Sequence, residues 1–169
     1  MVTLDLSRHS LLRFCQNHLK DGVIPNPEEG QRISSEDAKE AVRCAKSMLR
    51  VFHQAPEVHL PPLVGFYKFI KHGTRPTRYF FRSGLLFTVI GHDGKDIMVT
   101  VAAIPKERRD TLLEMAGSDG KAYLSTVDKI VVPYRLRERL DPVGICLEDG
   151  RIVLITFEEK NEESLRPRP

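Results

Sequence analysis

Residues 77 to 104 carry the pattern that most constrains the fold. Two runs rich in aromatic and β-branched residues, RYFFR and LLFTVI, are separated by Ser83-Gly84, and a third run, IMVTVAAI, follows the Asp93-Gly94 dipeptide. Runs of this composition are typical of strands, and Asp-Gly is typical of a tight hairpin turn. The sequence therefore predicts an antiparallel meander of three strands.

Helical patterns precede this meander. Ser7 is a predicted N-cap for a helix over residues 8 to 20, and Ser34 and Asp37 have the spacing of a capping box for a helix over residues 35 to 54. Apolar residues recur in the second helix with the 3.6-residue period of an amphipathic helix. Its other side reads as an ordinary solvent-facing surface and carries mostly charged residues, namely Lys39, Glu40, Arg43, Lys46 and Arg50.

Shorter elements complete the prediction. The pattern favours a third helix over residues 61 to 72, begun by two prolines, and a fourth over residues 106 to 117, with a loop at SDGKAYLS. A short strand at residues 129 to 133 and a C-terminal hairpin that pairs residues 143 to 147 with 152 to 158 follow.

Helices first and strands later are typical of an α+β fold. We expect N-terminal helices packed on an antiparallel β-meander, with an additional C-terminal hairpin. Residues 1–158 are expected to form a single domain, a size that allows a sizeable buried core. The tail, residues 159–169, is polar and proline-rich and is predicted to be disordered.

Composition and motifs exclude several classes. No apolar run is long enough to span a bilayer and no signal peptide is recognisable, so we expect a cytoplasmic protein without a membrane partner. Three scattered cysteines argue against a disulfide framework, and two of them, Cys15 and Cys44, fall on apolar helix faces where inert buried thiols are expected. Glycine-rich phosphate loops and metal-ligand spacings are absent, which predicts no cofactor and no metal site.

Charge is distributed unevenly along the chain. The net charge is only +3, yet residues 58 to 92 contain no Asp or Glu at all. Uncompensated positive charge beside aromatic residues is typical of a surface that binds a polyanion, although it can equally be a solvated face. The predicted nucleic-acid-binding residues are four basic side chains of this stretch and the histidine that ends it, namely Lys68, Lys71, Arg75, Arg78 and His92.

His9 and Arg13 form one local pattern with possible chemistry. They lie at positions i and i+4 of the first predicted helix and therefore share a face one turn apart. Imidazole titrates near neutral pH, and guanidinium binds phosphate, so the pair suits acid–base work next to a phosphate. An exposed His and Arg on an amphipathic helix would explain the same pattern.

The order of these features resembles a family of small ribonucleases. The matching features are a His-x-x-x-Arg helix, a Gly-x-x-x-x-Arg-Tyr strand entry and two strands, found here as His9-Ser10-x-x-Arg13, Gly73, Arg78-Tyr79, Leu85 to Ile90 and Val99-Thr100-Val101. They resemble the metal-independent barnase–EndoU–colicin–RelE-like superfamily over about residues 7–104. The chain departs from that pattern at Asn17, where a second Arg or Lys is often seen, and in the C-terminal hairpin, which has no counterpart there.

The resemblance implies a toxin-like endoribonuclease, with an inhibitory protein partner, that cleaves RNA through the RNA's own 2′-hydroxyl. Such a reaction needs an acid–base group and cations around the charged phosphate. It implies acid–base work for His9, phosphate contacts for Arg13, Arg82 and Thr100, and base stacking or a hydrogen bond for Tyr79.

Two alternatives stay open. The basic residues at 68–82 could bind nucleic acid, RNA in preference to DNA, without cleaving it. A protein-interaction adaptor or regulator could instead present the same positive surface to an acidic partner.

Overall fold

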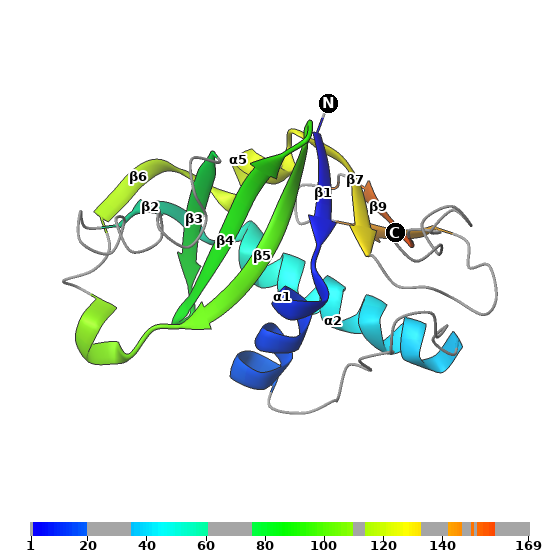
Figure 1. The fold of residues 1–169 in the computed structure, drawn as a ribbon, viewed down its shortest axis with the longest axis horizontal. Coiled ribbons are helices and arrows are strands. Elements are labelled where there is room, and N and C mark those ends of the chain that lie inside the picture. Colours follow the sequence, from blue (N-terminus) through cyan, green and yellow to red (C-terminus); the bar gives the residue numbers. More distant parts are fainter. Residues whose placement is uncertain are drawn as a thin grey trace, which may run out of the picture.

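The computed structural model describes residues 2–19, 35–60, 76–109, 114–132, 142–146, 150 and 152–157. Its central feature is a nine-stranded sheet with the strand order β6-β2-β3-β4-β5-β1-β7-β9-β8 (Figure 1). The strands are β1 (Val2–Leu6), β2 (Pro56–His59), β3 (Thr77–Arg82), β4 (Leu85–His92), β5 (Lys95–Ala103), β6 (Glu114–Asp119), β7 (Val127–Val132), β8 (Val143–Cys146) and β9 (Ile152–Phe157). The helical elements are α1 (Arg8–Phe14), the π-helical turn η1 (Cys15–Leu19), α2 (Ser35–His53), the 3₁₀ turn η2 (Lys106–Arg108) and α5 (Gly120–Leu124).

The predicted meander is confirmed. Strands β3, β4 and β5 pair antiparallel in sequence order. Their two connections are the predicted turns, in which Ser83, Gly84, Asp93 and Gly94 all have positive φ values between 51° and 77°. Glycine adopts this conformation without strain, and tight hairpin turns require it.

The α+β class is also confirmed, but the sheet is mixed. Beyond β5, three strands run parallel to their neighbours: β1 pairs with β5 and β7, and β9 pairs with β7. The C-terminal hairpin of β8 and β9 is confirmed and joins the far edge of this parallel part. Strand β1 was not predicted, since an alternation of apolar and polar residues over only five positions is a weak signal for a strand. Leu4 and Leu6 are fully buried, whereas Asp5, on the opposite face, forms an ion pair with Lys95.

The first two predicted helices are confirmed. The Ser7 side chain accepts a hydrogen bond from the Ser10 N–H and so caps α1, and η1 continues the helical path to Leu19. Helix α2 ends at His53, one residue before the predicted end. The predicted third helix, residues 61 to 72, lies outside the described residues, as does the tail.

The prediction of a fourth helix over residues 106 to 117 is wrong in its last part. Residues 106–108 form the 3₁₀ turn η2, and residues 110–113 lie outside the described residues. The last predicted residues, 114–117, belong to β6, which pairs with β2. The predicted loop at SDGKAYLS instead contains α5, where the Asp119 side chain accepts a hydrogen bond from the Ala122 N–H. Pairing with a strand distant in sequence outweighed local helix propensity in the Glu114–Asp119 segment.

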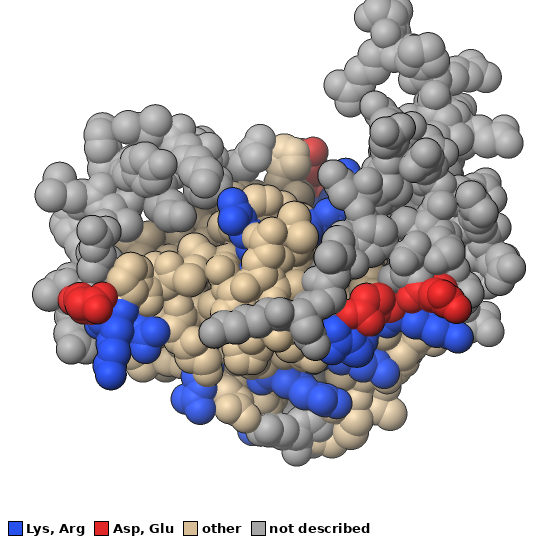
Figure 2. Space-filling model, turned by 90° about the horizontal axis from the view of Figure 1, so that it is seen from below, with Lys and Arg blue, Asp and Glu red and all other residues tan. Residues whose placement is uncertain are grey.

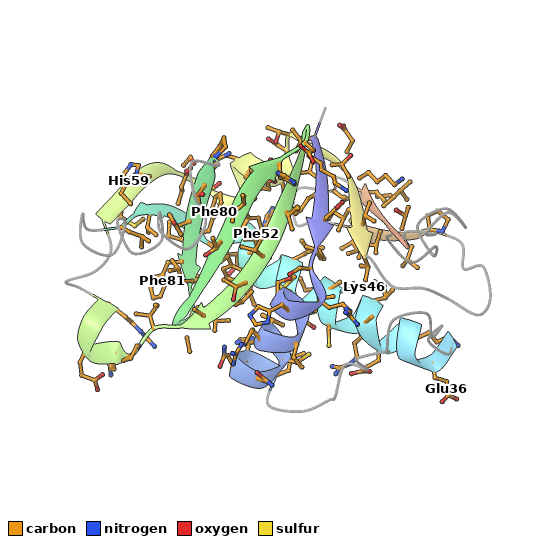
Figure 3. All side chains as sticks on the ribbon, in the orientation of Figure 1. Glu36, Lys46, Phe52, His59, Phe80 and Phe81 are labelled. Atoms are coloured by element: carbon orange, nitrogen blue, oxygen red, sulfur yellow. The ribbon has the colours of Figure 1, made fainter. Side chains whose placement is uncertain are left out.

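The core lies between the sheet and the helices. Phe52 of α2 makes edge-on contacts with Phe80 of β3, Phe87 of β4 and Tyr123 of α5, at ring-centroid distances of 4.7, 5.4 and 5.8 Å. Figure 3 shows Phe52 and Phe80 next to each other where α2 crosses the sheet. Helix α2 therefore covers one face of the sheet and turns its opposite side to solvent.

Candidate nucleic-acid interface

His9 and Arg13 lie on α1, at the lower side of the molecule in Figure 1. The Ser7 hydroxyl donates to the Val99 carbonyl, and the Asn17 amide donates to the Val101 carbonyl, so both ends of the α1–η1 unit are fixed to β5. Asn17, the departure from the ribonuclease pattern, thus has a structural contact. His9 and Arg13 are both exposed, and the only hydrogen bond described for Arg13 is a long one, 3.4 Å, to the Gln16 side chain.

Tyr79 and Thr100 lie on the sheet face that points away from α2. Thr88 of β4 stands directly opposite Tyr79 on one side and Thr100 on the other, so the three side chains form one row across the meander. The adjacent row, which contains Phe80 and Phe87, faces α2. Burial raises the pKa of the Tyr79 phenol above its usual value of about 10, at which the phenol is already protonated at neutral pH.

Arg82 lies on the other side of the sheet from Tyr79. The two residues are three positions apart in β3, and successive side chains of a strand alternate between faces. Arg82 is exposed, and its Nη2 donates to the Gln54 Oε1 at the C-terminal end of α2, at 3.3 Å. The five predicted catalytic residues therefore divide between two faces and do not converge on one site.

Two of the five predicted nucleic-acid-binding residues, Arg78 and His92, lie in the described part of the chain. Lys68, Lys71 and Arg75 lie outside the described residues. His92, at the β4–β5 turn, has its Nε2 3.1 Å from a carboxylate oxygen of its neighbour Asp93.

Arg78 is held by a carboxylate. Its Nε and Nη2 donate to the two oxygens of Glu57 at 3.0 and 2.7 Å, and the Ser118 hydroxyl also donates to Glu57. The guanidinium lies over the rings of Phe80 and Tyr123, at 5.3 and 5.2 Å from their centroids. Arg78 thus connects β2, β3, β6 and α5, and its charge is compensated.

This ion pair leads to a prediction about stability. The hydrogen bonds from Arg78 hold the pKa of Glu57 below its usual range. A depressed carboxyl pKa stabilises the fold above the unfolded-state value, about 4.3, and this contribution is lost as the pH falls through the folded-state pKa. Glu57→Gln should therefore lower the Tm by ~3 °C at pH 7 and by much less at pH 3, as measured by thermal denaturation. Glu107→Gln, at an exposed position in η2, is the control and should change the Tm at neither pH.

Helix α2 presents a basic stripe that the sequence prediction treated as ordinary solvent chemistry. Lys39, Arg43, Lys46 and Arg50 occupy positions i, i+4, i+7 and i+11, which fall within an arc of about 60° on a helix of 3.6 residues per turn. This arc is opposite the buried positions Ala41, Cys44, Ala45, Met48 and Phe52. The spacing was visible in the sequence, but only packing shows that this side of the helix stays uncovered by any described element.

Most basic side chains on and near the exposed side of α2 have no carboxylate partner among the described residues. Arg43 is paired with Glu40 of the same helix, whereas no ion pair engages Lys39, Lys46 or Arg50 in the described part of the chain. The side chains of Arg13 and Arg82 donate hydrogen bonds to neutral amides, those of Gln16 and Gln54. We call these five uncompensated cations the basic face: Arg13, Lys39, Lys46, Arg50 and Arg82.

Figure 2 views the molecule from below, the side on which α1 and α2 lie in Figure 1. Lys and Arg side chains are spread across the lower part of this view, while the Asp and Glu side chains in view are fewer and lie at the left, at the right beside Lys and Arg, and at the top. Figure 3 places Glu36 at the start of α2 and Lys46 near its middle. Positive charge therefore dominates the central part of this surface.

Among the residues that the structure describes, no three His, Cys, Asp or Glu side chains are grouped to hold a metal ion. Within the same ranges, no helix combines the length and apolar character needed to cross a bilayer. Comparison of the chain with known proteins found no family model, no curated protein and no solved structure that matches it.

Proposed function

We propose that this protein binds RNA through the basic face, by contacts to phosphates and without cleaving the strand. The observation that carries the proposal is the straight row of cations on α2, extended by Arg82 next to the end of the helix. RNA is preferred to DNA because of the sequence resemblance to ribonucleases.

The dimensions of the row support this proposal. Lys39 and Arg50 are 11 residues apart, which corresponds to about 16 Å along a helix axis. Side chains three or four positions apart are about 5–6 Å from one another, so each can engage its own phosphate along a strand. Contacts of this kind give affinity without sequence specificity.

The lack of carboxylate partners for cations on α2 also supports RNA binding there. A cation that is already paired with a carboxylate gains little by exchanging it for a phosphate, and Arg78 is in that position. Lys46 and Arg50 have no such partner among the described residues, so binding a phosphate costs them no ion pair. Released counterions then supply the binding free energy.

Cleavage fits the geometry less well than binding, because the residues that cleavage needs are divided between the faces of the sheet. His9 lies on the exposed side of α1, whereas Tyr79 and Thr100 point away from α2. Cleavage would need these groups around one substrate phosphate, and their separation by the sheet disfavours such a site. Binding is therefore the function that the geometry supports best.

The salt dependence of binding tests the phosphate contacts. For a fluorescent single-stranded RNA oligomer, Lys46→Ala should reduce the affinity about fivefold at 0.1 M salt, and the slope of log K against log salt should fall by about 0.7. Fluorescence anisotropy between 0.05 and 0.3 M salt measures both. Lys129→Ala removes the same charge from an exposed position on β7, away from α2, and is the matched control. An equal effect of the two substitutions would contradict a role for α2.

Incubation of the same RNA with the protein in excess EDTA separates binding from cleavage. We expect a salt-sensitive complex and an intact strand, and His9→Ala should change neither. Ends with a 2′,3′-cyclic phosphate that disappear in His9→Ala would instead establish the ribonuclease. A protein that neither binds nor cleaves RNA would favour the adaptor alternative.

A further inference from the structure

Two cysteines from different helical segments meet inside the core. Cys15 is the first residue of η1 and Cys44 lies in the middle of α2, 29 positions later, yet their Sγ atoms are 2.7 Å apart. Both side chains are almost completely buried, with 1% and 0% of their surface exposed, and they are not cross-linked in the structure. The third cysteine, Cys146, is exposed on β8.

From this juxtaposition we infer that Cys15 and Cys44 are a redox modification site, at which a disulfide joins the α1–η1 unit to α2. A disulfide requires an Sγ–Sγ distance of about 2.05 Å, so the sulfurs must approach by only about 0.7 Å. The bond would close a loop of about thirty residues. Closing a loop of that length restricts the unfolded chain far more than the folded one.

The surroundings make the pair a protected site rather than a reactive one. Burial, and contact with the Cys15 sulfur, raise the pKa of the Cys44 thiol, which disfavours the thiolate that reacts with oxidants. The pair is less suited to binding a metal ion. A structural zinc site needs four ligands, and the described residues supply no third ligand near the two thiols. The pair is thus suited to a bond that forms slowly and persists.

The backbone at Cys15 allows an oxidant to reach the thiol pair through a small local opening. The Cys15 N–H donates to both the Leu11 and Leu12 carbonyls, and the π-helical turn begins at this residue. Such turns are wider and less regular than α-helix. Opening of one short turn, and not of the whole core, exposes the Cys15 sulfur.

The oxidant is a low-molecular-weight disulfide, such as oxidised glutathione. One protein thiolate attacks it and forms a mixed disulfide with release of one glutathione thiol. The second protein sulfur then attacks the mixed disulfide and releases the second glutathione thiol. Two electrons and two protons thus pass from the two protein thiols to glutathione, and one protein S–S bond forms.

Equilibrium with glutathione tests the inference. The full chain carrying Cys146→Ser is incubated in buffers of varied reduced-to-oxidised glutathione ratio, starting from both redox states, and the disulfide is quantified by intact mass and peptide mapping. The same titration in 6 M guanidinium chloride gives the value for the unfolded chain. The effective concentration of the thiol pair should be about 100-fold higher in the folded protein, and the oxidised form should melt ~8 °C above the reduced one.

Two variants keep the result interpretable. Cys15→Ala and Cys44→Ala, each in the Cys146→Ser background, cannot form the bond and should show no difference in Tm between the two redox conditions. Equal stability of the disulfide in the folded and unfolded chain would overturn the inference, as would a folded protein whose thiols stay reduced under conditions that oxidise the unfolded chain. The outcome is independent of RNA binding, because Cys44 lies on the side of α2 opposite the basic stripe.

Discussion

Reversing two charges of the basic face should reduce RNA affinity by at least about 25-fold. In Lys46→Glu/Arg50→Glu, two phosphate contacts are lost, and each is worth about fivefold at 0.1 M salt for a single strand. The two new carboxylates add repulsion, so 25-fold is a lower limit. Anisotropy titrations with the RNA oligomer measure the effect.

A matched variant removes the influence of total charge. Lys121→Glu/Lys129→Glu changes the net charge by the same amount, but its two exposed positions lie on α5 and β7. It should bind RNA within about threefold of the unmodified protein, since charges beyond a Debye length are largely screened. Circular dichroism must show that both variants are folded. If the two variants lose affinity equally, the protein attracts RNA through its overall charge and the proposed face has no special role.

Gly120→Ala should destabilise the protein by about 3 kcal/mol, or ~10 °C in Tm. A Cβ added to Gly120 would overlap the Phe52 carbonyl oxygen, at much less than the 3.0 Å that real Cβ contacts respect. The Gly120 N–H also donates to the Ala55 carbonyl at 2.6 Å, so the backbones of α5 and of the α2 end are in direct contact. Because both partners are backbone, neither can rotate away.

Gly94 provides the control for this substitution. It has a positive φ of 76° in the β4–β5 turn, and no atom lies within 4 Å of the position of an added Cβ. Asn tolerates this conformation, so Gly94→Asn should cost less than about 1 kcal/mol. Thermal denaturation measures the Tm of both variants. A Tm for Gly120→Ala close to that of Gly94→Asn would show that α5 does not pack against α2 as described.

The functional site could not be predicted from the sequence, because the sequence does not show which residues point to the same side of the fold. The residues were chosen by their chemistry and order, and these do not specify a common site. Tyr79 and Arg82 are close in sequence, yet the two-residue period of a strand sends them to opposite faces. Arg78 was expected to meet a polyanion, but Glu57, which is brought next to it by the pairing of β2 with β3, compensates its charge.

Elements whose signals are local could be predicted from the amino-acid sequence. The meander, the Ser7 cap, helix α2 and the C-terminal hairpin follow from periodicity, capping and turn chemistry over a few neighbouring residues. The short strands β1, β2 and β6 could not be predicted in this way, because they are stabilised by partners far away in the chain. The same holds for the cations that remain uncompensated and for the two cysteines that meet, since both depend on contacts between residues that no local pattern relates.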